Sequence, residues 1–164
     1  MRCNGWRNDM AITIALPKGR LLRRTSALLQ KAGWELDEYH AKSSFYRPTS
    51  ATYPELVIRI FNEKDIPIQI AMGNYDLGIC CLDWIEELLI KYPSSQLVKV
   101  RDLGYGEGTL YMAGTLPLEN LYRNKGGKAV RIASEYPHLA ESWALRKRLE
   151  RFNVYSLWGA AEAY

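Results

Sequence analysis

The sequence predicts an α/β fold built on mostly parallel sheets. Short apolar runs alternate with amphipathic stretches along the 164 residues, which is typical of strands connected by crossover helices. The first run, residues 11–16, is almost continuously apolar and rich in β-branched side chains, as expected of a strand buried on both faces. A central strand near the start of the chain is therefore the first expected element.

The other elements follow from the same patterns. A helix is expected from residue 21 to about Gly33, because leucines recur near helical spacing and glycine is a common helix stop. Three glycines at residues 104–108 predict a flexible joint between a first lobe, residues 11–103, and a second lobe, residues 104–164. Further strands are expected at 56–61, 76–81, 96–103, 109–114, 129–133 and 154–157, and helices at 64–72, 83–92, 117–122 and 135–151.

Composition narrows the class of protein. Hydrophobic residues make up 48% and charged residues 24%, which is ordinary globular usage. No apolar run approaches the roughly 18–20 residues that a membrane span needs. The 22 basic and 18 acidic residues are interleaved, so an anionic small molecule is a better expected ligand than nucleic acid, whose binders carry a clustered basic face.

The cysteines and the N-terminal segment indicate the compartment. Three cysteines, two of them the adjacent Cys80 and Cys81, do not form a secreted disulfide framework. The first ten residues lack the apolar region of a signal peptide. We therefore expect a cytoplasmic protein.

The first candidate site follows the first predicted strand. Lys18, Gly19 and Arg20 lie between that strand and the next helix, where backbone N–H groups bind anions. Arginine offers phosphate a two-pronged donor, lysine a point charge, and glycine close access to the backbone. A simple strand-to-helix turn with two solvated basic residues explains the pattern equally well.

A second candidate surrounds the strand expected at 76–81. Asp76 and Gly78 lie at its start, and in open α/β sheets ligands gather at strand ends. Asp76 is placed to accept a ribose hydroxyl or to orient a basic residue. A turn that initiates the strand is the favoured explanation when this segment is taken alone.

Neither nucleophilic catalysis nor a protein-made metal cage is indicated. The chain has two histidines, His40 and His138, and neither falls in a pattern typical of a Ser/His/Asp or Cys/His site. Acidic residues do not cluster as an all-protein metal site requires. A participating metal is expected to be Mg²⁺ carried by substrate phosphates.

Six segments of the chain together form a recognisable pattern. They are residues 14–21 (Ile-Ala-Leu-Pro-Lys-Gly-Arg-Leu), 64–67, 73 with 76–79, 102–104, 131–137 and 157–162. Each one alone is a weak signal, but in this order and spacing they resemble the catalytic region of the ATP phosphoribosyltransferase family, from about residue 11 to the end.

The resemblance implies a two-lobed fold like that of the type II periplasmic binding proteins, with substrate held between the lobes. It implies transfer of phosphoribosyl from phosphoribosyl pyrophosphate to N1 of ATP with release of pyrophosphate and with Mg²⁺, the first step of histidine biosynthesis. Expected partners are a second copy of the chain, in a homodimer or larger assembly, and a synthetase-like regulatory subunit. The implied catalytic residues are Arg20 and Lys18, and the implied substrate contacts are Gly19, Asp76, Gly78 and Glu162.

The sequence departs from the family pattern at its end. In the family, a loop of the type D-x-x-x-[ST]-G-x-T follows and wraps the 5′-phosphate of phosphoribosyl pyrophosphate, but this sequence ends at Tyr164. We therefore expect an incomplete second lobe and little or no turnover by this chain alone. The alternative is a catalytically silent module of the same fold that binds a small anion.

Overall fold

The computed structural model describes residues 11–42, 45–120 and 128–158. The chain divides into two units, Met1–Ile85 with Ser95–Glu107 and Glu86–Ser94 with Gly108–Tyr164. Within the described residues, each unit contains its own parallel sheet. The predicted α/β class with parallel strands is confirmed, whereas the predicted lobes remain a prediction.

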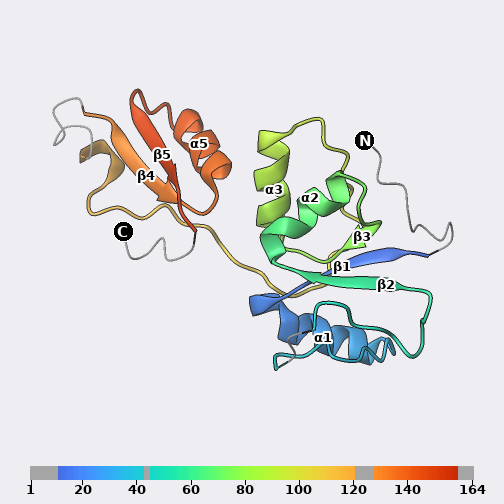
Figure 1. Cartoon of the computed structure of the whole chain (residues 1–164). Helices are drawn as coiled ribbons and strands as arrows, with labels where there is room; N and C mark the ends of the chain where they lie inside the picture. The colour runs from blue at the N-terminus through green and yellow to red at the C-terminus, as the bar shows by residue number, and fades with distance from the viewer. Residues whose placement is uncertain (1–10, 43–44, 121–127, 159–164) are drawn as a thin grey trace. The chain divides into compact units, whose positions relative to one another are not determined.

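The first unit is built on a three-stranded parallel sheet with β1 in the centre (Figure 1). β1 (Thr13–Pro17) pairs with β2 (Val57–Phe61) on one side and with β3 (Leu77–Gly78) on the other. Its residues from Ile14 to Pro17 are buried, as expected of the apolar run. A central strand is enclosed in this way because crossover helices cover both faces of a parallel sheet.

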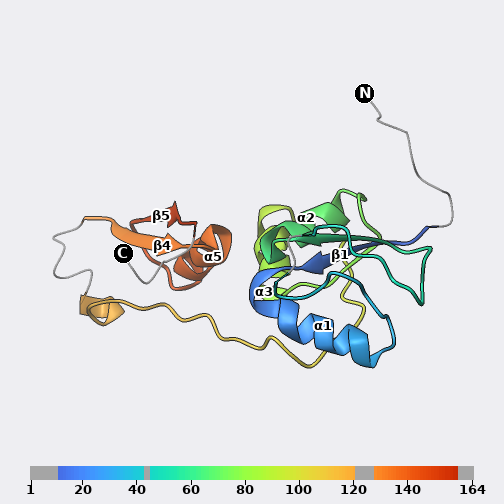
Figure 2. The same ribbon diagram turned by 60° about the horizontal axis from the view of Figure 1, so that its bottom comes forward.

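Two helices of the first unit cover opposite sides of this sheet. α1 (Leu22–Lys31) lies on one side and α2 (Ile66–Ala71) on the other, as Figures 1 and 2 both show. Short 3-10 turns precede both helices. The helices predicted at 21–33 and 64–72 are therefore confirmed.

The main hydrophobic core of the first unit lies between the sheet and α1. The buried residues of this core are Ile14, Leu16, Leu29, Tyr39, Ile58 and Ile60.

The second unit contains a strand–helix–strand motif. β4 (Val130–Ser134) and β5 (Phe152–Ser156) run parallel, and α5 (Pro137–Arg146) connects them. Small residues on α5 allow the helix to lie close to the sheet. The buried core comprises Val130, Ile132, Ala140, Ala144 and Leu149.

The residues of another helix are divided between the two units. α3 (Leu82–Lys91) begins in the first unit, and from Glu86 its residues group with the second. None of the helices among the described residues is long and apolar enough to cross a bilayer.

Two predicted strands do not form. The segments 96–103 and 109–114 are rich in apolar residues, but neither pairs with a strand in the described part of the chain. Val98 and Tyr111, for example, are 82% and 86% exposed. An apolar segment forms a strand only where a neighbouring strand supplies backbone partners and side-chain contacts, and no described segment does so here.

The helix predicted at 135–151 is shorter than expected. It begins at Pro137 and ends at Arg146, and Arg148 then adopts a positive φ of 55°. The Leu149 N–H donates to the Ala144 carbonyl at 3.0 Å, a bond that satisfies one of the last carbonyls of the helix. The chain can then enter β5 with Leu149 buried in the core.

Gly78 provides a test of the packing between α2 and the sheet. A Cβ atom at this position would lie 2.6 Å from Cγ2 of Ile66, which is itself fully buried. We expect Gly78→Ala to lower the free energy of unfolding by about 1–3 kcal/mol, because overpacking forces the helix away from the strand.

Urea denaturation followed by circular dichroism measures this loss. Gly108→Ala is the matched control, because a Cβ there meets nothing within 4 Å. Equal stability of the two variants would contradict the packing account.

Candidate functional site

The candidate site lies at the carboxyl edge of the first sheet. Three loops meet there: residues 18–20 after β1, residues 62–65 after β2 and residues 79–81 after β3, the last leading into α3. Parallel strands place their carboxyl ends on one edge, which is where ligands of open α/β sheets bind.

Gly19 shapes the loop that follows β1. The Lys18 N–H donates to the Phe61 carbonyl at 2.8 Å, which continues the pairing of β1 with β2 by one residue. Gly19 then adopts a φ of +79°, a conformation that costs glycine little and strains other residues. This turn directs the chain out of the sheet and starts the 3-10 turn Gly19–Leu21.

Arg20 is held by two carboxylates while most of its side chain remains accessible. Its Nε donates to Oε2 of Glu63 at 3.1 Å, and its Nη2 lies 3.4 Å from Oδ2 of Asp83. Nη2 also lies 3.4 Å from the Cys81 sulfur. The side chain is nevertheless 61% exposed, so the guanidinium is fixed in place and open to a ligand.

Glu63 is the residue that joins the three loops. Its carboxylate, only 9% exposed, accepts the Leu21 N–H at Oε1 (3.3 Å) as well as Arg20 Nε at Oε2. The Cys81 thiol donates to the same Oε2 at 3.6 Å. One side chain from the β2 loop thus contacts both the β1 loop and the β3 loop.

Sequence reasoning missed Glu63. The available signal was a charged residue two positions beyond the predicted strand 56–61, at the same edge as Lys18 and Arg20. A single sequence does not show that such a residue is buried, and a glutamate in a loop is more commonly exposed.

Lys18 faces a different neighbour. Its Nζ lies 5.2 Å from the centre of the Tyr46 ring, within the range of a cation–π contact. The two predicted catalytic residues, Lys18 and Arg20, are separated in the chain by Gly19 alone. Their side chains nevertheless contact different residues, Tyr46 for Lys18 and Glu63 for Arg20.

Two tyrosine hydroxyls also form hydrogen bonds close to the β1 loop. The Tyr39 hydroxyl donates to the Pro17 carbonyl at 2.7 Å, and Tyr39 is buried. Thr25 on α1, also buried, shares a 2.8 Å hydrogen bond with the hydroxyl of Tyr105 in the glycine-rich joint. Burial raises the pKa of both tyrosines, so both hydroxyls are protonated at neutral pH.

The charged groups of the site stabilise one another. Burial alone would lower the pKa of Arg20, but the hydrogen bond and negative charge of Glu63, aided by Cys81 and Asp83, leave it above the ordinary value. Burial raises the pKa of Cys80 to about 12, and burial together with Glu63 raises the pKa of Cys81. The site therefore presents a permanent cation beside protonated, weakly nucleophilic thiols.

Asp76 lies away from this cluster. Its Oδ2 accepts both the backbone N–H and the hydroxyl of Thr13, at 2.8 and 2.7 Å. Thr13 is the first residue of β1, so Asp76 lies at the amino edge of the sheet, opposite Lys18 and Arg20. These bonds agree with the strand-initiating role that the sequence favours for this segment taken alone.

The other two predicted contacts are also outside the cluster. Gly78 pairs with Ala15 inside the sheet, and the close approach of Ile66 accounts for the glycine. Glu162 lies outside the described residues. The structure thus places Lys18, Gly19 and Arg20 at the carboxyl edge of the sheet. The catalytic roles of Lys18 and Arg20 stay predictions. So does substrate contact by the other predicted residues, Gly19, Asp76, Gly78 and Glu162.

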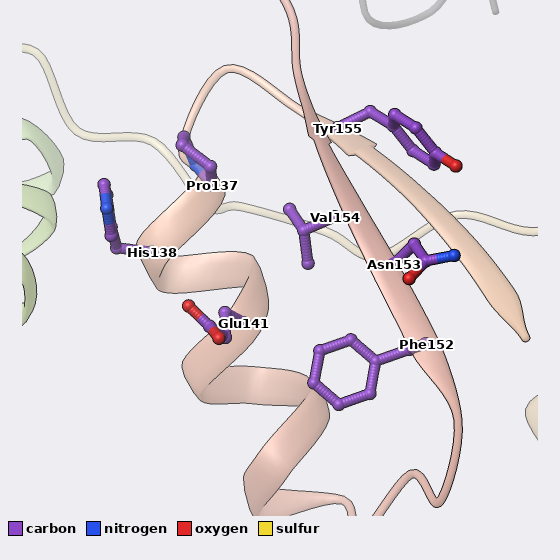
Figure 3. Close-up of a pocket in the computed structure, with 7 residues that line it drawn as sticks. All are labelled: Pro137, His138, Glu141, Phe152, Asn153, Val154 and Tyr155. Atoms are coloured by element: carbon purple, nitrogen blue, oxygen red, sulfur yellow. The ribbon is translucent and has the colours of Figure 1, made fainter.

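The second unit contains an open cavity of about 580 Å³ between α5 and β5. Figure 3 shows Phe152 and Val154 directed from β5 toward α5, with Glu141 on the helix side. The amino end of α5 is not an open anion site, because Glu87 occupies it. The Glu87 carboxylate accepts the N–H groups of His138 and Leu139 at 2.9 and 2.8 Å.

A resident metal site is not formed by the described residues. No three His, Cys, Asp or Glu side chains among them are grouped so that they could hold a metal ion. At the carboxyl edge, Glu63 and Asp83 are already engaged with Arg20. These carboxylates do not fit a protein-held Mg²⁺ ion.

The chain is similar to proteins of one known family. The family model described as "HisG: ATP phosphoribosyltransferase" matches residues 62–164. An ATP phosphoribosyltransferase of Lachnoclostridium phytofermentans is 30% identical over 153 residues, covering 92% of this chain and 67% of the relative. One of Bacillus pumilus is 31% identical, covering 92% of this chain and 65% of the relative.

A solved structure supports the fold. An "ATP phosphoribosyl transferase (HisG:HisZ) complex from Thermotoga maritima" superposes with a TM-score of 0.63 over 92% of this chain and 66% of that chain, at 19% identity. The chain spans from about half to two thirds of the length of the curated relatives.

The two adjacent thiols provide a test of the local electrostatics. Alkylation requires the thiolate, and a raised pKa lowers the thiolate fraction at any pH below it. At pH 8 we expect iodoacetamide to modify Cys80 at least about tenfold more slowly in the folded chain than in urea, where a thiol pKa returns to about 8.5. Cys81, whose pKa is also raised, should likewise react more slowly in the folded chain.

Mass spectrometry of the peptide that contains both cysteines measures these rates. The rate in the folded chain should continue to rise above pH 9, while the rate in urea levels off. Equal rates in both states at pH 8 would show that burial does not suppress the thiolates.

Proposed function

Because the chain belongs to the ATP phosphoribosyltransferase family, we propose that it binds ATP and phosphoribosyl pyrophosphate at the carboxyl edge of its first sheet. The reaction is transfer of the phosphoribosyl group to N1 of the adenine ring with release of pyrophosphate. The observation that carries this proposal is the accessible Arg20 guanidinium, fixed by buried Glu63.

The chemistry of this reaction fits the residues of the site. The adenine ring nitrogen is itself the nucleophile, so the protein needs no activated serine or cysteine. Protonated Cys80 and Cys81 agree with that requirement. What the reaction needs is alignment of two polyanions and stabilisation of the charge on departing pyrophosphate.

Each residue of the β1 loop has a proposed role. Arg20 donates two N–H groups to a phosphate, and Lys18 adds a second positive charge. Gly19 carries no side chain between the backbone and the ligand, so phosphate oxygens can approach the main chain. Mg²⁺ belongs to the proposal as an ion carried by the substrate phosphates. The roles proposed for Lys18, Gly19 and Arg20 do not depend on a metal ion held by the protein.

The wider organisation belongs to the same proposal. We infer a two-lobed architecture like that of the type II periplasmic binding proteins, with lobes at residues 11–103 and 104–164. A homodimer or larger assembly in the cytoplasm follows from the family resemblance. A regulatory subunit is supported by the Thermotoga maritima structure, whose name describes a complex.

Arg20→Ala tests the proposed site directly. Loss of a charge-assisted contact to phosphate should weaken ATP binding by at least about tenfold. Isothermal titration calorimetry measures the affinity, and Arg24→Ala is the matched control because Arg24 is an exposed residue of α1. Unchanged ATP affinity in Arg20→Ala would contradict the placement of the substrate.

Pyrophosphate release distinguishes catalysis from simple binding. With ATP, phosphoribosyl pyrophosphate and Mg²⁺, we expect the release of pyrophosphate to fall at least about tenfold in Arg20→Ala, because the guanidinium stabilises the charge on the leaving group. Release that is unchanged in Arg20→Ala would contradict the proposed role of Arg20. Binding of other small anions but not of ATP would instead indicate a silent anion-binding module.

A further inference from the structure

We propose that the two carboxylates beside Arg20 have opposite effects on anion binding. Glu63 is a positioning residue that holds the guanidinium toward the substrate, whereas Asp83 is a counter-ion that a substrate phosphate displaces. This inference rests on the proposed function, because it concerns the anion that Arg20 receives.

Glu63 holds the arginine from a buried position. Its two oxygens bind two groups of the same loop, the Leu21 N–H and the Arg20 Nε–H. A carboxylate that is anchored at the main chain cannot follow the guanidinium if the arginine moves. The Nε edge of Arg20 is therefore fixed relative to the backbone of its own loop, and the other edge is available to a ligand.

Asp83 makes a weaker and more exposed contact. Its Oδ2 lies 3.4 Å from Nη2 of Arg20 and its side chain is 19% exposed, whereas charge-assisted N–H···O bonds are typically about 2.7–2.9 Å. The other oxygen, Oδ1, accepts the Trp84 N–H at 2.8 Å. When a phosphate takes Nη2, Asp83 keeps this backbone partner, so the exchange leaves no carboxylate without a hydrogen bond.

The two roles predict opposite signs for one chemical change. Glu63→Gln and Asp83→Asn each remove one negative charge near the anion, and simple Coulomb attraction predicts tighter binding in both variants. A glutamine at position 63 has only one carbonyl oxygen, so its NH₂ group must face either the Leu21 N–H or the Arg20 Nε–H. Positioning by Glu63 therefore predicts weaker binding in that variant despite the more favourable charge.

Calorimetric titration with inorganic pyrophosphate, and separately with ATP, measures this difference. We expect Glu63→Gln to weaken binding about tenfold, the usual effect of losing a charged hydrogen bond, and Asp83→Asn to leave it equal or tighter. Glu55→Gln is the charge-matched control, because Glu55 is exposed and precedes β2 at the amino edge. Thermal denaturation identifies any variant whose loss of binding reflects unfolding.

A measurement on the unaltered chain makes the proposal independent of the variants. During titration with pyrophosphate, the NMR signal of the Arg20 Nε–H should persist and the ¹³C signal of the Asp83 carboxyl should move. The Glu63 carboxyl signal should move less, because its hydrogen bonds are retained.

The outcomes separate this inference from the proposed function. Tighter binding in Glu63→Gln, or loss of the Nε–H signal on titration, would overturn the positioning role while the function stands. Weaker binding in Asp83→Asn would overturn the counter-ion role. Failure of the unaltered chain to bind either pyrophosphate or ATP would overturn the proposed function and this inference with it.

Discussion

A single buried carboxylate holds the candidate site together. Glu63 leaves the sheet after β2, but its partners belong to the β1 loop and to the segment after β3. Without it, the buried Leu21 N–H would lose its partner, which is costly, and the Arg20 Nε–H would lose the contact that positions the guanidinium. The position of Arg20 therefore depends on a residue of the loop after β2 and not only on its own loop after β1.

The sequence predicts the scaffold better than it predicts the site. An apolar run such as residues 11–16 fixes a buried central strand, because few other structures accommodate it. The apolar segments at 96–103 and 109–114 also predict strands, yet they lack strand partners among the described residues. A strand forms only when it pairs with another strand, which can be distant in the sequence. The local pattern of residues does not show whether such a partner exists.

The same limit explains which site residues were found. Lys18, Gly19 and Arg20 carry a local signature, since a glycine between basic residues directly follows a buried strand. Asp76 has a similar signature before its strand, but in a parallel sheet that places it at the opposite edge, where it binds Thr13. Glu63 has only a weak local signal, a charged residue two positions after a predicted strand, and its role becomes visible only when three loops meet.

The central claim is that a substrate phosphate binds at the carboxyl edge of the first sheet. The most direct measurement is the change in backbone amide NMR signals when ATP is added to the ¹⁵N-labelled chain. The account predicts that the largest changes occur at Gly19, Arg20 and Leu21, with smaller changes near Glu63. Changes confined to the cavity between α5 and β5, or to the Asp76 edge, would contradict it.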